Sequence, residues 1–192
     1  MRIRVYQWIT LLMLVYTSPV IAVDADNTLV IEVAGGTSGT VEIELLPDLA
    51  PEHVKRIKEL TRSKAYDGVV FHRVIDGFMA QTGDVQFGNR KRTGDGTPGF
   101  GGSELPNLDQ EFSAEPHVEG VVSMARSKDL NSANSQFFIV IGDAKFLDGK
   151  YTVFGRVISG METVHEIKKG EGRSGAVTNP DYMASVYLKS EL

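Results

Sequence analysis

Residues 71–84 read FHRVIDGFMAQTGD. The segment 69–75, which overlaps the start of this stretch, is rich in β-branched and aromatic residues and is predicted to form a β-strand. Arg73 lies inside this apolar segment. A charged side chain in such a strand needs either a partner or an exposed face. A face that binds a ligand would be such an exposed face. We therefore take Arg73 as the first candidate functional residue.

The surrounding sequence predicts a mainly β fold. At 40–46, three apolar residues alternate with glutamates, which is typical of a half-buried strand. Strands are also predicted over 28–33, 120–125, 136–141, 152–158 and 183–188, and helices over 51–62 and 161–169. This order lacks the regular strand–helix alternation of a parallel sheet and favours an antiparallel barrel or sandwich. Residues 83–111 show no apolar period and are predicted to form a long surface loop.

The composition excludes several classes of site. The 192 residues include no cysteine, which excludes disulfides, zinc–thiolate sites and thiol nucleophiles. With 20 basic and 25 acidic residues, the net charge is −5, and we expect no nucleic-acid partner. The glycines of GDGTPG at 94–99 follow a basic polar run instead of a strand, which argues against a nucleotide-dependent enzyme. The four histidines show no ligand spacing, so we expect neither a metal nor a cofactor.

The N-terminal residues are typical of an export signal. Arg2 and Arg4 precede an apolar run at 9–16, and small residues follow a Thr-Ser-Pro break. This order predicts a signal peptide over 1–22 and a mature domain over 26–192. The alternative is an uncleaved membrane anchor over residues 5–23, although several polar residues weaken that stretch. We expect contact with a membrane only if this segment is not cleaved.

Two further motifs accompany residues 71–84. The first combines SMAR at 123–126 with NSQFFI at 134–139, and the second is FLDGKYTVFG at 146–155. Together the three resemble the signature of the cyclophilin-type peptidyl-prolyl cis/trans isomerases, over nearly all of residues 28–188. The resemblance implies an eight-stranded antiparallel barrel capped by two α-helices. It also implies a cofactor-free enzyme that rotates X–Pro bonds in unfolded or partly folded proteins.

The resemblance assigns roles to residues within these motifs. Arg73 would be the catalytic donor, Gln81 would help to place it, and Phe78 would line the proline pocket. The substrate-binding residues would be Met79, Ala125, Arg126, Gln136, Phe138, Phe146, Leu147 and Tyr151. Without the resemblance, Phe78 and Phe138 would be assigned to the core.

These residues divide between two parts of the expected site. The proline ring would be surrounded by Phe78, Met79, Phe138 and Leu147. A groove for the residues preceding proline would be lined by Ala125, Arg126 and Gln136. Arg126 is expected to act mainly through its backbone. Phe146 and Tyr151 stand where many relatives carry tryptophan and histidine, as in bacterial cyclophilins. Together with the absence of cysteine, this predicts a location in a Gram-negative periplasm. We also expect a monomer.

The chemistry of rotation also points to Arg73. Rotating an X–Pro bond breaks amide resonance, at a cost of about 18–20 kcal/mol, and the prolyl nitrogen regains its lone pair. A fixed donor beside that nitrogen or a nearby carbonyl stabilises the twisted state selectively, and arginine stays charged at any working pH. We therefore expect little pH dependence of activity between about pH 6 and pH 8. A proline-peptide-binding module with little turnover is the alternative, which would not need Arg73.

Overall fold

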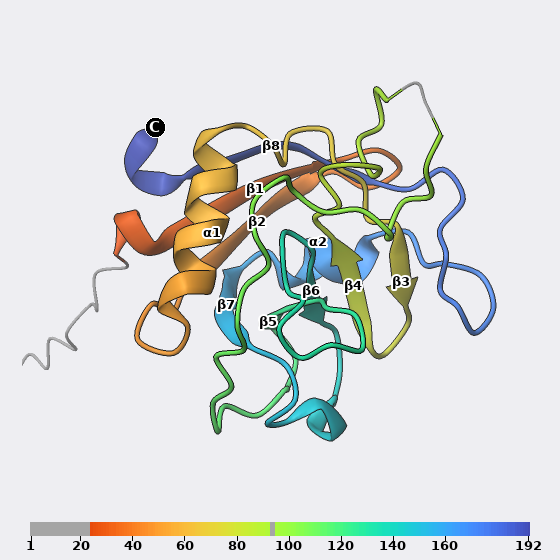
Figure 1. Cartoon of the computed structure of the whole chain (residues 1–192). Coiled ribbons are helices and arrows are strands. Elements are labelled where there is room, and N and C mark those ends of the chain that lie inside the picture. The colour runs from red at the N-terminus through yellow and green to blue at the C-terminus, as the bar shows by residue number, and fades with distance from the viewer. Residues whose placement is uncertain (1–23, 93–94) are drawn as a thin grey trace, which may run out of the picture.

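The computed structural model describes residues 24–92 and 95–192. Within them, eight antiparallel strands form one sheet in the order β3-β4-β6-β5-β7-β2-β1-β8 (Figure 1). The strands are β1 (Thr28–Ala34), β2 (Gly39–Leu45), β3 (Arg73–Ile75), β4 (Met79–Thr82), β5 (Val121–Met124), β6 (Phe137–Val140), β7 (Val153–Ser159) and β8 (Tyr182–Leu188). The helices are α1 (Pro51–Arg62) and α2 (Met161–Glu166), with short 3-10 turns η1 (Ala25–Asn27), η2 (Lys145–Leu147) and η3 (Lys189–Glu191).

The sheet curls until its two ends meet. Val70, just before the edge strand β3, forms an isolated bridge with Tyr182 at the start of the other edge strand, β8. The N–H of Phe71 also donates to the carbonyl of Asp181 over 2.9 Å. Curling covers the edges that would otherwise expose unpaired backbone groups. The predicted mainly β, barrel-like fold with two helices is confirmed.

The prediction was wrong about some element boundaries. The strand expected over 69–75 is a ladder only at Arg73–Ile75, and the residues before it form single bridges to Asn89 and Tyr182. The strand Met79–Thr82 was not predicted because its four residues include Ala80 and Gln81, which give no strong β signal. The second helix ends at Glu166, since the N–H of Lys168 already donates to the carboxylate of Asp181.

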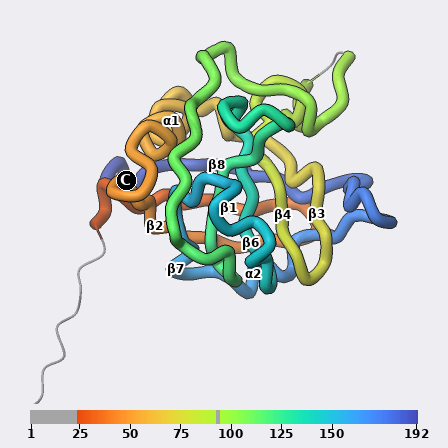
Figure 2. The backbone as a smooth tube through the Cα atoms, turned by 60° about the horizontal axis from the view of Figure 1, so that its bottom comes forward, coloured from red at the N-terminus to blue at the C-terminus, as the bar shows by residue number. Residues whose placement is uncertain are grey.

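Helix α1 connects the barrel to the long segment between β4 and β5. Proline at the first helical position and an apolar stripe of Val54, Ile57 and Leu60 bury one face of the helix in the core. Arg56, on the same helix, donates to the carbonyls of Pro106 and Asn134 over 2.8 and 3.2 Å. Figure 2 shows this long segment, coloured green, running past α1 along the outside of the sheet.

Strand β6 is buried on both faces, and this divides the core into two clusters. Phe137 and Ile139 point into the barrel, where Phe137 makes edge-to-face contacts with Tyr66 and Phe154. Phe138 and Val140 point to the other face and belong to a second cluster, with Met79, Val121, Ala144, Leu147 and Val153. The alternation of side chains along the strand thus carries apolar residues to a surface outside the barrel.

Across residues 24–92 and 95–192, no helix is long and apolar enough to cross a membrane. The segment predicted as a signal peptide, 1–22, lies outside the described residues.

Candidate functional site

A small cavity lies over the second apolar cluster. Its volume is about 130 Å³, and its lining is made of nine residues that the sequence had already singled out: Arg73, Phe78, Met79, Gln81, Ala125, Arg126, Phe138, Leu147 and Tyr151. The floor consists of Met79, Phe138 and Leu147, which are buried in the second cluster. Phe78 and Phe138 are therefore not part of the barrel core. We call this space the proline cavity.

The guanidinium of Arg73 forms the polar wall of the proline cavity. Arg73 on β3 is the register partner of Gln81 on β4, and its Nη1 donates to Gln81 Oε1 over 3.2 Å. Nη1 also lies 3.7 Å from the sulfur of Met79, and Nε donates to the carbonyl of Ser174 over 3.0 Å. Nη2 forms no hydrogen bond with the described residues. Burial lowers the pKa of Arg73 from its usual value, yet an arginine remains charged at neutral pH.

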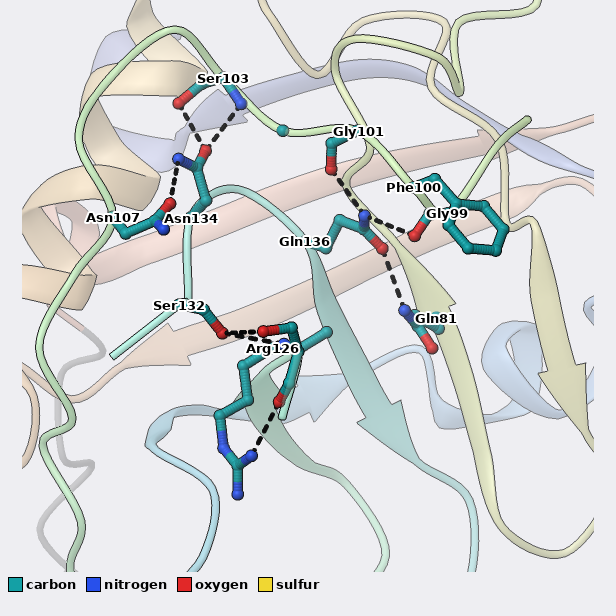
Figure 3. Close-up of a pocket in the computed structure, with 13 residues that line it drawn as sticks. Gln81, Gly99, Phe100, Gly101, Ser103, Asn107, Arg126, Ser132, Asn134 and Gln136 are labelled. Atoms are coloured by element: carbon teal, nitrogen blue, oxygen red, sulfur yellow. Dashed lines mark hydrogen bonds between the residues drawn. The ribbon is translucent and has the colours of Figure 1, made fainter. Parts of the chain in front are cut away.

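A chain of side-chain amides leads from Arg73 to a glycine-rich loop. Gln81 Nε2 donates to Gln136 Oε1 over 3.0 Å (Figure 3). Gln136 Nε2 in turn donates to the carbonyls of Gly99 and Gly101, over 3.0 and 2.8 Å. Each amide accepts at one end and donates at the other, so the chain fixes the orientation of both glutamines. Gln81 thereby presents its oxygen, and not its NH₂ group, to the guanidinium.

A larger cavity of about 570 Å³ adjoins the proline cavity, and the two share Gln81, Ala125 and Arg126. We call it the loop cavity because loops provide its other walls: residues 99–103 and Asn107 on one side, and Ser127, Ser132, Asn134 and Gln136 on the other (Figure 3). Asn134 ties the two sides together, because its Oδ1 accepts from Ser103 N and Oγ, each over 2.7 Å.

The carboxylate of Asp84 holds the 99–101 loop from beneath. Asp84 is fully buried, and its Oδ2 accepts the N–H groups of Gly99 and Gly101 over 2.7 and 3.0 Å. Its Oδ1 accepts the N–H groups of Gln86 and Phe87 over 3.1 and 2.8 Å. Four backbone donors thus compensate the desolvation of a buried charge. Asp84 was not among the predicted site residues, although an acid at the end of the FHRVIDGFMAQTGD stretch and just before a glycine-rich loop was a usable signal.

The rim of the proline cavity is formed by residues of the 146–151 turn. Arg126 donates from Nε and Nη2 to the carbonyl of Lys150, over 3.2 and 2.7 Å, and lies 4.4 Å from the ring centroid of Tyr151. Arg126 was expected to contribute through its backbone. In the structure its side chain also joins the segment that follows β5 to the 146–151 turn. Phe146 is 61% exposed and reaches the cavity only through Phe78, with ring centroids 5.3 Å apart.

Residues 28–188 match the family model described as "Cyclophilin type peptidyl-prolyl cis-trans isomerase/CLD". The chain belongs to this family. A "Probable peptidyl-prolyl cis-trans isomerase" of Brucella suis is 54% identical over 172 residues, which cover 88% of this chain and 86% of that relative. A "Peptidyl-prolyl cis-trans isomerase-like 3" of Gallus gallus is 44% identical over 131 residues, covering 68% of this chain and 77% of the relative.

Solved cyclophilin structures share the fold. The crystal structure of AquaCyp293 from Hirschia baltica has a TM-score of 0.73 and 30% sequence identity, covering 88% of this chain and 76% of that chain. A Cryptosporidium parvum cyclophilin, crystallised in the presence of the dipeptide Ala-Pro, has a TM-score of 0.67 and 27% identity, covering 84% of this chain and 98% of that chain.

This cyclophilin also contains a serine–histidine–aspartate chain behind the proline cavity. Ser123 Oγ lies 3.0 Å from His117 Nε2, and His117 Nδ1 lies 3.0 Å from Asp148 Oδ1. Ser123 and His117 are fully buried, and the imidazole packs parallel to the ring of Phe138. No substrate can reach a buried serine, so this row of three hydrogen-bonded side chains has a structural role. It ties the turn that carries Leu147 to the barrel behind Phe138.

His72 lies beneath the 99–101 loop, which lines the loop cavity. A β-carbon at Gly99 would lie 2.9 Å from its Cδ2 atom, which shows how closely the loop packs on the ring. Burial lowers the pKa of His72, so the ring is neutral at pH 7. No three His, Asp or Glu side chains come together as a metal site within the described residues.

Proposed function

We propose that this peptidyl-prolyl cis-trans isomerase accelerates X–Pro rotation by stabilising the twisted amide, without forming a covalent bond to the substrate. The observation that carries the proposal is the position of Arg73: its guanidinium borders an apolar cavity, and Gln81 fixes its orientation. Nη1 and Nε are held by the protein, so Nη2, which bonds to none of the described residues, is the donor left for a substrate.

The proline cavity suits one small apolar ring. At about 130 Å³ it is well below the roughly 300–1,000 Å³ of pockets that hold drug-sized ligands. Its floor of Met79, Phe138 and Leu147 grips the pyrrolidine ring by apolar contact. The ring also excludes water, and a hydrogen bond from Arg73 is stronger in the resulting low-dielectric space.

Catalysis follows from a difference between two states of the same bond. In the planar amide, the prolyl nitrogen shares its electron pair with the carbonyl and accepts no hydrogen bond. In the twisted state the pair is localised and accepts one from the guanidinium. An interaction made mainly in the twisted state lowers the barrier, whereas one made equally in both states would only improve binding. No proton has to leave Arg73, so this step needs no titrating group.

The substrates we propose are unfolded or partly folded polypeptides, with the residues preceding proline in the loop cavity. Uncatalysed X–Pro exchange takes about 10–100 s at 25 °C and can limit the rate of folding. An isomerase that accelerates this exchange therefore speeds folding. We further propose that residues 1–22 direct export to a Gram-negative periplasm, where the domain 26–192 acts as a monomer. The basic and apolar order of the N-terminus and the absence of cysteine support the export and the location.

The test is an isomerisation assay on a short Ala-Pro peptide, comparing the parent with Arg73→Ala. We expect Arg73→Ala to lower kcat/KM by about 10²–10³-fold, as for removal of a single preorganised donor. Peptide binding should change little, because the floor of the cavity remains. Arg62→Ala is the matched control, since Arg62 lies on α1 and pairs with Glu191 away from both cavities.

Two results would contradict the proposal. If Arg73→Ala keeps the parent rate, the guanidinium does not stabilise the twisted state. If the parent binds the peptide without accelerating exchange, the chain is a proline-peptide-binding module.

A further inference from the structure

Phe100 is held on the rim of the loop cavity with its ring in solvent. Its side chain is 83% exposed and lines the cavity (Figure 3). Exposure alone says little, because single apolar residues are common on protein surfaces. The backbone on both sides of Phe100 is the informative feature.

Both neighbours of Phe100 are fixed by hydrogen bonds from opposite directions. Asp84 accepts the N–H groups of Gly99 and Gly101, and Gln136 donates to the carbonyls of the same two residues. The N–H of Phe100 itself donates to the carbonyl of Thr97 over 3.2 Å. The crest of the loop, residues 99–101, is therefore held in place. The ring of Phe100 is presented at a defined position and not on a freely moving loop.

The packing around Phe100 requires glycine on both sides of it. Gly99 has a φ of +99°, a region that side chains rarely adopt. A β-carbon at Gly101 would lie 2.4 Å from Asp84 Oδ1. Both flanking positions thus require glycine, and Phe100 supplies the side chain at the crest. The buried carboxylate of Asp84 is thus committed to holding a loop whose one large side chain points into solvent.

The rest of the loop cavity is mainly polar. Hydroxyl and amide groups come from Ser103, Asn107, Ser127, Ser132 and Asn134, and these groups bond to one another within and across the two walls (Figure 3). An apolar side chain entering this space would find its large apolar contact in the ring of Phe100. Because the loop cavity shares Gln81, Ala125 and Arg126 with the proline cavity, a peptide with its proline in the proline cavity would place its preceding residues in the loop cavity.

We propose that Phe100 is a specificity-determining residue, which selects substrates carrying an aromatic or large aliphatic side chain shortly before the proline. The inference rests on the proposed function, since it assumes that the proline ring occupies the proline cavity. Phe100 contributes to recognition and not to rotation itself. Its contact with the substrate is the same in the planar and twisted states, so it acts on KM more than on kcat.

The experiment measures kcat/KM for peptides that share Ala-Pro and differ two or three residues before the proline, with phenylalanine, leucine or serine there. We expect the parent to prefer the phenylalanine peptide over the serine peptide by about two- to tenfold, the range of an aromatic contact. In Phe100→Ala this preference should disappear through a higher KM for the phenylalanine peptide, while the serine peptide is turned over as in the parent. Phe100→Tyr should keep the preference.

Ile158→Ala is the matched control, because Ile158 is also an exposed apolar residue but lines neither cavity. It should leave the preference unchanged. A parent that shows equal rates for all peptides, or a Phe100→Ala variant that keeps the preference, would overturn the inference and leave the proposed function standing. A parent that accelerates exchange in none of the peptides would overturn both.

Discussion

The proline cavity and the loop cavity share three residues, and they are built in different ways. The floor and catalytic wall of the proline cavity come from neighbouring strands, with Arg73 on β3, Met79 and Gln81 on β4, and Phe138 on β6. The walls of the loop cavity come from segments without regular structure, held by side chains that bond to backbone groups.

This difference separates two tasks. A ladder of strands places side chains at fixed spacing, which suits a donor that must meet one nitrogen in one geometry. Loops tolerate sequence change, and a surface that distinguishes substrates is expected there. The amide chain from Arg73 through Gln81 and Gln136 to Gly99 and Gly101 is the link between the two.

After the loss expected for Arg73→Ala, the largest effect should come from a substitution in the floor of the proline cavity. Phe138→Ala should lower kcat/KM by about 10²-fold, because the proline ring loses its support and sits out of line with Arg73. It should also lower the free energy of unfolding by about 3 kcal/mol. An isomerisation assay and urea unfolding measure the two effects.

The neighbour of Phe138 provides the matched control. Phe137→Leu removes part of a ring that points into the barrel, so it should lower stability while leaving kcat/KM almost unchanged. Equal losses of activity in the two variants would mean that the two faces of β6 are not separate in function.

A smaller effect is expected from Asp84→Asn, which loosens the loop cavity. The new NH₂ group would face backbone N–H donors, so one or more hydrogen bonds are lost and stability should fall by about 2 kcal/mol. Amide hydrogen exchange at Gly99 and Gly101 should become faster than in the parent. Activity on a minimal Ala-Pro peptide should change less than activity on a longer peptide that fills the loop cavity. An equal loss on both peptides would show that the two cavities do not act separately.

The smallest effect concerns pH and two buried histidines. His53, beside Glu111 and the start of α1, and His72, beneath Gly99, both have a pKa lowered chiefly by burial. The unfolded chain therefore binds more protons below about pH 6.5. The stability that depends on the neutral rings is complete above that pH and is lost as pH falls toward the folded pKa values, by up to about 1.4 kcal/mol per pH unit for each histidine.

Unfolding in urea at several pH values measures this loss, and His72→Phe should reduce its slope. A slope that stays the same in His72→Phe would show that His72 does not contribute. Activity on the minimal peptide should stay flat between about pH 6 and pH 8, since Arg73 keeps its charge there and no proton has to leave it.

The sequence was sufficient for the proline cavity because its residues lie in short, distinctive motifs. Arg73, Phe78, Met79 and Gln81 fall within one run of nine residues, and alternation along the strands sends Phe138 and Phe137 to opposite faces. The same reasoning failed for the strand Met79–Thr82, which is too short and too polar to show a period of its own. Its place is set by pairing with β3 and β6.

By itself, then, the sequence determined the mainly β class, the positions of α1 and most strands, and the residues around Arg73, since each depends on patterns that repeat within a few residues. Only the tertiary structure decided the loop cavity. Its hydrogen bonds join residues far apart in the chain, such as Asp84 with Gly101 and Ser103 with Asn134. Such bonds have no periodic signature, because they form between backbone groups that any residue carries and that only folding brings together.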